Sequence, residues 1–219
     1  MAKDVITKDM TVAEAVKVNP DIMDILAKEN IDFCCGGKHP LKEAVEAKGK
    51  DIDSFVAMLN QVEPVKESTR ADAFKMSKAE LVDYIIRHFH RPQLEQLDQI
   101  EMGLAKLLNV HYAHHHKELF DVYKRFMSIK ADLVPHFAQE EQDDFPRFLN
   151  GEAVDFSELV AEHEAVGEKL EALHEVTNNY QVPADGCNTY HYIFKLMGEF
   201  ERSLHEHIFY ENSILFLMK

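Results

Sequence analysis

Four histidines have the spacing expected of metal ligands on successive antiparallel helices. They are His90, His136, His163 and His207. The midpoints between neighbours fall at residue 113, between residues 149 and 150, and at residue 185, where the sequence looks least helical. Helices that reverse at these midpoints bring all four imidazoles to one level, because the chain rises equally on both sides of each turn. The spacing therefore predicts a metal site inside a helical bundle.

Two of these histidines are followed by a glutamate four residues later, giving the pairs His136–Glu140 and His207–Glu211. On a helix this spacing puts both side chains on one face, within about 6 Å. Imidazole nitrogen binds iron, zinc, copper or nickel, whereas a carboxylate can bridge two cations. Four histidines and two bridging glutamates can thus hold two metal ions. Two histidines and two shared carboxylates per ion leave positions open for small molecules, so the site should be reactive.

A single pair of this kind is usually a hydrogen-bonded pair on a solvated helix face. Here the adjoining positions are apolar, including Leu133 and Phe137 beside the first pair and Leu204 and Ile208 beside the second. Such neighbours place both pairs near a core, where unpaired charge is costly, and this favours ligation. Two further glutamates, Glu141 and Glu162, are candidates for hydrogen bonds that orient the ligand imidazoles.

The other histidines are not expected to be ligands. His111 lies 21 residues from His90, which is about 31 Å along a continuous helix and too far to share a metal. Residues 114–116, three histidines in succession, are interpreted as an exposed loop cluster at the first turn. The remaining histidines have no partner at a telling spacing or point away from the site, and we interpret them as structural.

Length, charge and composition limit the class of protein. The 219 residues, 46% of them hydrophobic, suffice for one bundle of about 140 residues and a small second domain. A net charge of -15 argues against nucleic-acid and anionic-membrane partners. No apolar run approaches the roughly 18 residues of a membrane span, and residues 1–10 do not resemble a secretion signal. Three cysteines, two of them adjacent, suit a reducing compartment, so we expect a cytoplasmic protein.

The chain is predicted to be all-α, with residues 1–62 as a small helical domain, residues 63–76 as a polar linker and residues 77–219 as a four-helix bundle. A capping box formed by Ser77 and Glu80 starts the first long helix, and Pro92 predicts a kink just after His90. The first turn is expected at residues 112–116. The remaining bundle helices are expected at residues 117–149, 157–178 and 187–217.

Short helices are predicted in the first domain around residues 12–16, 22–26, 41–48 and 51–61, and Cys34-Cys35-Gly36-Gly37 forms a turn between the two helix pairs. These cysteines are either ordinary thiols at a helix junction or redox-active or iron-handling groups. Adjacent glycines make the turn flexible, and the charge of Lys38 would favour the thiolate. Cys187 lies at the last bundle turn, where it is incidental, caps a helix or faces the first domain.

The segment Asp-Phe-Cys-Cys-Gly-Gly-Lys at residues 32–38, followed by His90, His136-x3-Glu140, Glu162-His163 and His207-x3-Glu211-Asn212, resembles the repair-of-iron-centres family of di-iron proteins. The resemblance covers essentially the whole chain. It implies a hemerythrin-like up-down bundle with two non-haem iron ions joined by an oxo or hydroxo bridge. It also implies a cytoplasmic homodimer that restores iron–sulfur clusters damaged by nitric oxide or peroxide, with damaged iron–sulfur proteins as partners.

The pattern departs from that of oxygen-carrying hemerythrins, because the position four residues after His163 is Gly167 rather than histidine. Fewer imidazoles favour a reactive or labile iron pair over a reversible oxygen carrier. We therefore expect iron donation to damaged clusters, with Cys34 and Cys35 relaying iron or electrons. Two alternatives stay open, namely a nitric oxide or peroxide reductase at the di-iron centre, and a sensor of oxygen or nitric oxide; whether the protein is an enzyme is undecided.

Overall fold

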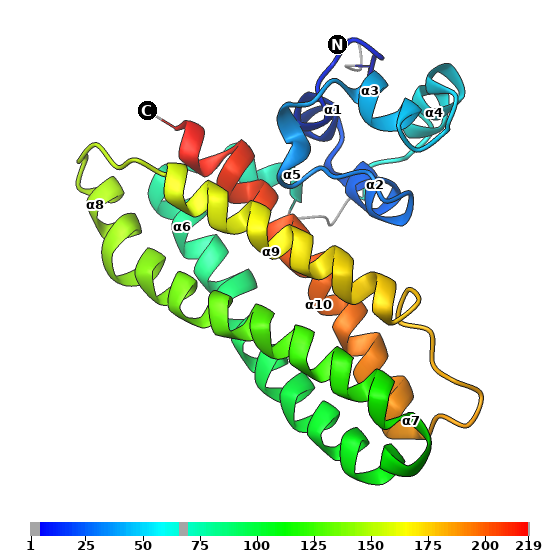
Figure 1. Cartoon of the computed structure of the whole chain (residues 1–219). Coiled ribbons are helices and arrows are strands. Elements are labelled where there is room, and N and C mark those ends of the chain that lie inside the picture. Colours follow the sequence, from blue (N-terminus) through cyan, green and yellow to red (C-terminus); the bar gives the residue numbers. More distant parts are fainter. Residues whose placement is uncertain (1–4, 66–69, 219) are drawn as a thin grey trace. The chain divides into compact units, whose positions relative to one another are not determined.

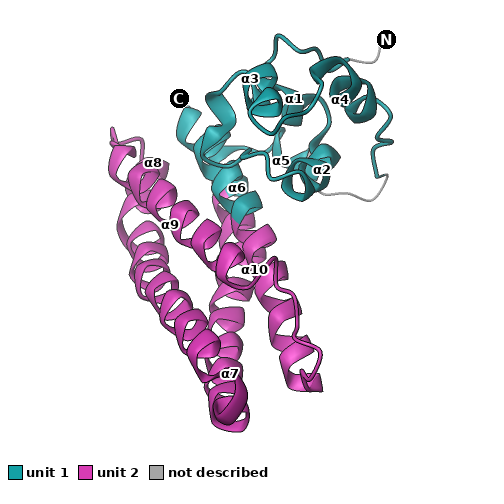
Figure 2. Ribbon diagram, turned by 45° about the vertical axis from the view of Figure 1, so that its right-hand side comes forward, with its two compact units in different colours: residues 1–81, 205–219 teal, residues 82–204 magenta. Residues whose placement is uncertain are grey.

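The computed structural model describes residues 5–65 and 70–218 (Figure 1), and within these ranges every extended regular element is a helix. The only β feature there is an isolated bridge between Thr11 and Pro40. The chain divides into two compact units, shown in Figure 2: residues 82–204 form one, and residues 1–81 with residues 205–219 form the other. The predicted all-α class, a bundle with a small helical domain before it, is confirmed.

The first long helix begins where the capping box predicts. The Ser77 N–H donates to Glu80 Oε2 at 2.8 Å, and the Glu80 N–H donates to Ser77 Oγ at 3.4 Å. Helix α6, Lys78–Ile85, continues through a π-helical turn, Ile86–His90, into α7, Arg91–Gln139. Helical hydrogen bonding therefore continues past His90, with a π-helical turn just before Pro92. The kink expected there stays a prediction. A proline has no N–H to donate and its ring crowds the carbonyl four residues back, and the wider turn relieves both problems.

Helix α7 contains the first reversal of the bundle, which Figure 1 shows as a hairpin. His115 is the one residue inside it with non-helical backbone angles, φ -127° and ψ 19°. The two halves run side by side, because Lys130 bonds to Asp98 at 2.6 Å and also to Glu101. We expected a loop over residues 112–116; instead the chain turns at one residue, and helical hydrogen bonding resumes at once on either side.

A second π-helical turn, Glu140–Asp144, follows α7 and leads into α8, Phe145–Leu149. It too precedes a proline, Pro146, by two positions. After a turn with Gly151 at φ 81°, α9 spans Ser157–Val176 and α10 spans Asn188–Ser213, followed by a 3-10 turn, Leu215–Leu217. These bounds agree with the predicted helices to within a few residues.

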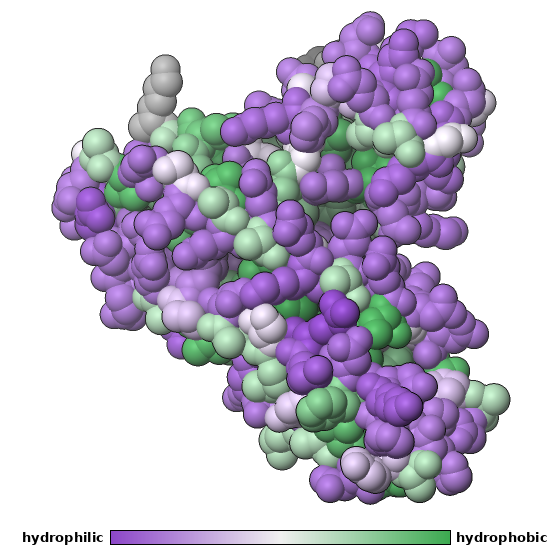
Figure 3. All heavy atoms as spheres, viewed as in Figure 1, coloured by the Kyte–Doolittle hydropathy of each residue, from purple (hydrophilic) through white to green (hydrophobic). Residues whose placement is uncertain are grey.

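The interior of the bundle is mostly apolar, and its buried polar residues include Gln93 and Thr177 besides histidines and carboxylates. The ring of Phe126 on α7, fully buried, packs edge-on against Phe200 on α10 at 6.1 Å. The face seen in Figure 3 is mostly covered by hydrophilic side chains, with apolar ones in small scattered areas. None of the helices in the described ranges combines the length and the apolar composition that crossing a bilayer requires.

In the other unit, α1 spans Val12–Val18, a 3-10 turn spans Pro20–Ile22, and α2 spans Met23–Lys28. Helix α3 spans Leu41–Glu46 and α4 spans Ile52–Leu59. These helices match the short ones predicted. The segment predicted as a linker contains a further helix, α5, Arg70–Ala73, while its residues 66–69 lie outside the described part. The boundaries of the linker stay a prediction.

Helix α5 is held by partners far away in the sequence, which is why local periodicity did not reveal it. The Arg70 guanidinium donates to Glu206 on α10 at 2.8 and 2.9 Å and to Asp24 on α2 at 3.2 Å. Nearby, the ring of Phe33 packs against Phe209 on α10 at 6.2 Å. Within this unit the short helices therefore pack on the last turns of α10, the stretch that carries His207 and Glu211.

We expect Phe126→Ala to lower the free energy of unfolding by about 3–5 kcal/mol, since it leaves a cavity in a close-packed core. Phe120→Ala, six residues earlier on the same helix, serves as the control because Phe120 is 54% exposed. Urea unfolding followed by circular dichroism measures both. Equal losses in the two variants would contradict the burial described for Phe126.

Candidate metal centre

Two buried imidazoles are fixed by carboxylates on their outer side. His90 Nδ1 lies 3.1 Å from Glu141 Oε1, and His136 Nδ1 lies 2.6 Å from Glu162 Oε2. These are the two orienting bonds that the sequence predicted. Each carboxylate accepts a hydrogen bond from Nδ1–H, so the neutral ring presents the lone pair of Nε2 on its other side. His90 is held further by stacking on Phe137, with ring centres 4.5 Å apart.

The inner nitrogens of these rings converge on Glu140. His90 Nε2 and His136 Nε2 each lie 3.5 Å from Glu140 Oε2, whose side chain is fully buried. His136 Nε2 also lies 2.9 Å from His163 Nε2 on α9. Three imidazoles and a carboxylate thus meet in the interior of the unit formed by residues 82–204, on three different stretches of chain, as the midpoint argument predicted.

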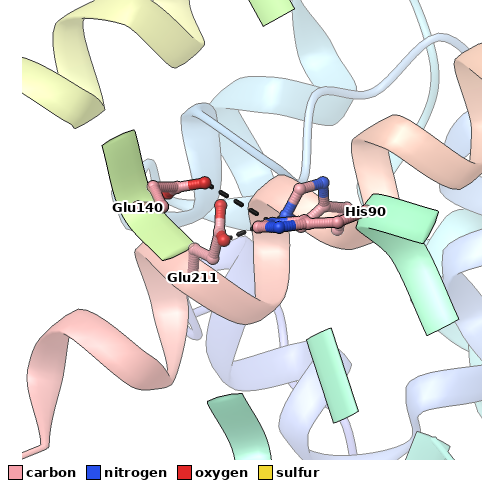
Figure 4. Close-up of side chains that lie close together, drawn as sticks. His90, Glu140 and Glu211 are labelled. Carbon is pink, nitrogen blue, oxygen red and sulfur yellow. Dashed lines mark hydrogen bonds and ion pairs between the residues drawn. The ribbon is translucent and has the colours of Figure 1, made fainter. Parts of the chain in front are cut away.

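The second predicted pair is equally buried. His207 Nε2 lies 2.9 Å from Glu211 Oε1, one helical turn further along α10. All six residues singled out in the sequence fall into two groups whose ligand atoms lie within 4.8 Å of one another. One group is His90, Glu140, His207 and Glu211, and the other is His136, Glu140, His163 and Glu211. Figure 4 shows the side chains of His90, Glu140 and Glu211 turned toward each other.

This donor set suits cations. Because Nδ1 of His90 and of His136 donates a hydrogen bond to an outer carboxylate, Nε2 of each neutral ring can offer a lone pair to a cation. Lone pairs that face a carboxylate favour a positive charge between them. Both glutamates belong to both groups, and each group adds two histidines of its own. Nitrogen and oxygen donors of this kind match divalent iron, manganese or zinc.

A hollow of about 280 Å³ opens beside this cluster between α7 and α9. Its lining includes His136, Glu162 and His163, with Leu133, Pro135 and Val166 among the apolar residues. The volume is enough for several waters or for a diatomic molecule beside two of the imidazoles. Small molecules therefore have space next to the site.

The two adjacent cysteines sit in an acidic setting rather than a basic one. Asp32 Oδ1 lies 3.2 Å from the Cys34 sulfur and accepts the backbone N–H groups of Cys34 and Cys35 at 2.9 and 3.0 Å. The hydrogen bond with Cys35, burial and the Asp32 charge raise the pKa of the Cys34 thiol well above its usual range. Our expectation that Lys38 would favour the thiolate was wrong for Cys34, because Asp32 is the charge in contact with it.

Asp32, Cys34 and Cys35 form a third group of potential ligands, with donor atoms within 4.8 Å of one another. The sequence argument missed the role of Asp32, although an aspartate two residues before a turn is a common acceptor for its N–H groups. The turn is also tied to α10, because Asn212 donates to the Cys34 carbonyl at 3.4 Å. Asn212 is the neighbour of Glu211 in the chain. The excluded His111 belongs to none of the three groups; its Nε2 lies 3.3 Å from the Cys187 sulfur.

An all-α bundle with buried histidine–glutamate groups defines a hemerythrin-like cation-binding protein, and comparison with known proteins agrees. The family described as hemerythrin HHE cation binding domain matches residues 81–218, and a domain of unknown function, ScdA_N, matches residues 8–63. The iron-sulfur cluster repair protein ScdA of Staphylococcus haemolyticus is 32% identical, over 96% of this chain and 98% of its own length. The iron-sulfur cluster repair protein YtfE of an Enterobacter species is 31% identical, over 95% and 96%. The chain belongs to this family of iron–sulfur cluster repair proteins, which confirms the resemblance seen in the sequence.

Loss of an orienting carboxylate should weaken metal binding. We expect Glu162→Ala to raise the dissociation constant for Fe²⁺ by about 10–100-fold, because the His136 imidazole loses the bond that fixes its tautomer. Anaerobic titration against a chromogenic chelator measures it. Glu164→Ala, on the exposed side of α9, is the matched control and should change nothing. Similar affinities in the two variants would count against an orienting role for Glu162.

Proposed function

We propose that this protein binds two non-haem iron ions and donates iron to iron–sulfur clusters damaged by nitric oxide or peroxide. The observation that carries the proposal is the division of six buried donors into two groups that share both glutamates. The names of the relatives, which are iron-sulfur cluster repair proteins, support the same activity. The proposed partners are damaged iron–sulfur proteins.

His90 and His207 would hold one iron, His136 and His163 the other, and Glu140 and Glu211 would bridge them. Bound ferrous iron would supply transferable metal and reducing equivalents, together with open positions for nitric oxide, oxygen or peroxide. The residues of the chain orient the ligand rings and leave room for small molecules to reach the site. Glu141 and Glu162 fix the tautomers of two ligand rings, the apolar core excludes bulk water, and the hollow beside His136 and His163 leaves room for small molecules.

Cys34 and Cys35 are proposed to receive iron during transfer. Three observations support this: their sulfurs and the Asp32 carboxylate form a group of potential ligands, the turn bonds to Asn212, and Asn212 adjoins Glu211. A thiol must lose its proton to bind metal. Asp32 opposes deprotonation of the thiol while no metal is bound, and it becomes a co-ligand once a cation is present.

Two other classes of function remain, an enzyme and a sensor or iron store, and each predicts a different measurement. A nitric oxide or peroxide reductase would turn over many times with an electron donor. A sensor would form a stable diatomic adduct, and an iron store would hold more than about two irons per chain; neither would transfer iron to a cluster. A cytoplasmic location and a homodimer are part of the proposal.

The ligand assignment is tested by iron content. Glu140→Leu or Glu211→Leu should lose half or more of the iron bound by anaerobically reconstituted protein, since each removes a ligand proposed for both ions. His111→Ala should keep the full iron content and the visible spectrum. Iron analysis with absorption spectroscopy gives both results. Loss of both irons from the His111 variant would show that the proposed register of the helices is wrong.

The repair activity is tested with an iron–sulfur dehydratase inactivated by nitric oxide. With a chelator scavenging free iron, iron-loaded protein should restore its activity, and iron-free protein should not. Cys34→Ser with Cys35→Ser should keep normal iron content but restore activity more slowly, by about tenfold. Cys187→Ser is the control for a cysteine outside the ligand groups. Repair at the normal rate by the double variant would contradict the thiol relay, whereas equal repair by iron-free protein would contradict iron donation itself.

A further inference from the structure

The third cysteine lies in surroundings unlike those of Cys34. Cys187 immediately precedes α10, whose first residue is Asn188, and it is partly exposed. The backbone N–H groups of Thr189 and Tyr190, at the amino end of this 26-residue helix, lower the pKa of its thiol. The exposed N–H groups and the dipole at a helix amino end stabilise negative charge.

A histidine approaches the same sulfur from the other side. His111 Nε2 on α7 lies 3.3 Å from Cys187 Sγ, and its ring is set against the ring of Tyr190, with centres 5.6 Å apart. The hydrogen bond from His111, followed by those from Tyr190 and Thr189, lowers the pKa of Cys187 to about 7. At pH 7 a thiol with this pKa is about half ionised, against about three percent for a thiol with the ordinary pKa of about 8.5.

The charged groups around His111 and Cys187 do not offset the lowered pKa of the thiol. The one carboxylate of the preceding connection, Asp185, is engaged by His115 at 2.9 Å. That hydrogen bond lowers the pKa of Asp185. Glu118 on α7 acts on Tyr190, whose pKa burial raises to about 12, so the tyrosine stays neutral. The sulfur thus has donors on two sides and no carboxylate among the groups that set its pKa.

We propose that Cys187 is a modification site, a nucleophilic thiolate held by His111 and the amino end of α10, which hydroperoxides oxidise to a sulfenic acid. The thiolate sulfur attacks one peroxide oxygen and forms an S–O bond while the O–O bond breaks. The departing hydroxide takes a proton from solvent and leaves as water. Sulfur loses two electrons and the peroxide gains them, so no other reductant is needed.

The sulfenic acid has no thiol to react with in its own unit, because Cys187 is the only cysteine in residues 82–204. It should therefore persist long enough to be trapped by dimedone. This chemistry is independent of metal binding, since neither Cys187 nor His111 belongs to a group of potential metal ligands in the described part of the chain.

The test follows each cysteine by mass spectrometry in the intact protein. The rate of iodoacetamide labelling at Cys187 should rise with a midpoint near pH 7 and at pH 7 should exceed that of free glutathione by about tenfold. Limiting hydrogen peroxide followed by dimedone should mark Cys187 before Cys34 and Cys35. A midpoint above pH 8.5, or no preference for Cys187, overturns the proposal, and neither result depends on a variant.

His111→Gln tests the role of the imidazole. The variant should label about tenfold more slowly at pH 7 yet at the same rate as the wild type at pH 10, where the thiol is ionised in both. His114→Gln, at an exposed position of the same turn, is the matched control and should behave as the wild type. A His111 variant that labels normally at pH 7, or that is slow at both pH values, overturns activation by His111.

Discussion

The burial of imidazoles and carboxylates inside a helical bundle is the constraint on which the rest of this structure depends. His90, His136, Glu140 and His163 are each at most 5% exposed, in a core that is mostly apolar. Removing such groups from water costs several kcal/mol each unless partners compensate. Glu141 and Glu162 accept hydrogen bonds from the histidines on the outer side of the cluster and so offset part of this cost. On the inner side, the histidine nitrogens face one another and Glu140. The fold therefore holds a buried cluster of donors that suits a positive charge.

The helices that carry this cluster depart from regular α geometry where the ligands lie. One π-helical turn ends at His90 and the other begins at Glu140, and each precedes a proline by two positions. An extra residue in a turn rotates the following side chains by about 100°, which changes the direction in which a ligand points. The prolines stabilise the wider turn because the hydrogen bond they cannot make is already absent there. We infer that these irregular turns are part of the site.

The sequence predicted that the four histidines lie at one level in the bundle. That prediction needs only an equal helical rise on both sides of each turn. It holds whether the reversal is a loop or, as here, the single residue His115. It did not predict α5, because Arg70 is held by Asp24 and Glu206, a partner 136 residues away. The packing of Phe33 on Phe209 and the bond from Asn212 to Cys34 are equally distant in sequence. A local periodic pattern gives no sign of contacts between residues that are far apart in the sequence. The spacing of buried residues along long helices, in contrast, predicts their level in the bundle.

The two cysteine environments show how neighbours decide what a thiol does. At Cys34, the Asp32 carboxylate and burial keep the proton on sulfur, so an electrophile meets a poor nucleophile. A cation reverses this preference, because it neutralises Asp32 and favours the ionised sulfur at the same time. Cys187 has the opposite arrangement, with donors and no carboxylate in contact, and it reacts without a cation. We therefore propose that one chain carries a thiol pair that responds to metal and a single thiol that responds to oxidants, and that the difference rests on Asp32 and His111.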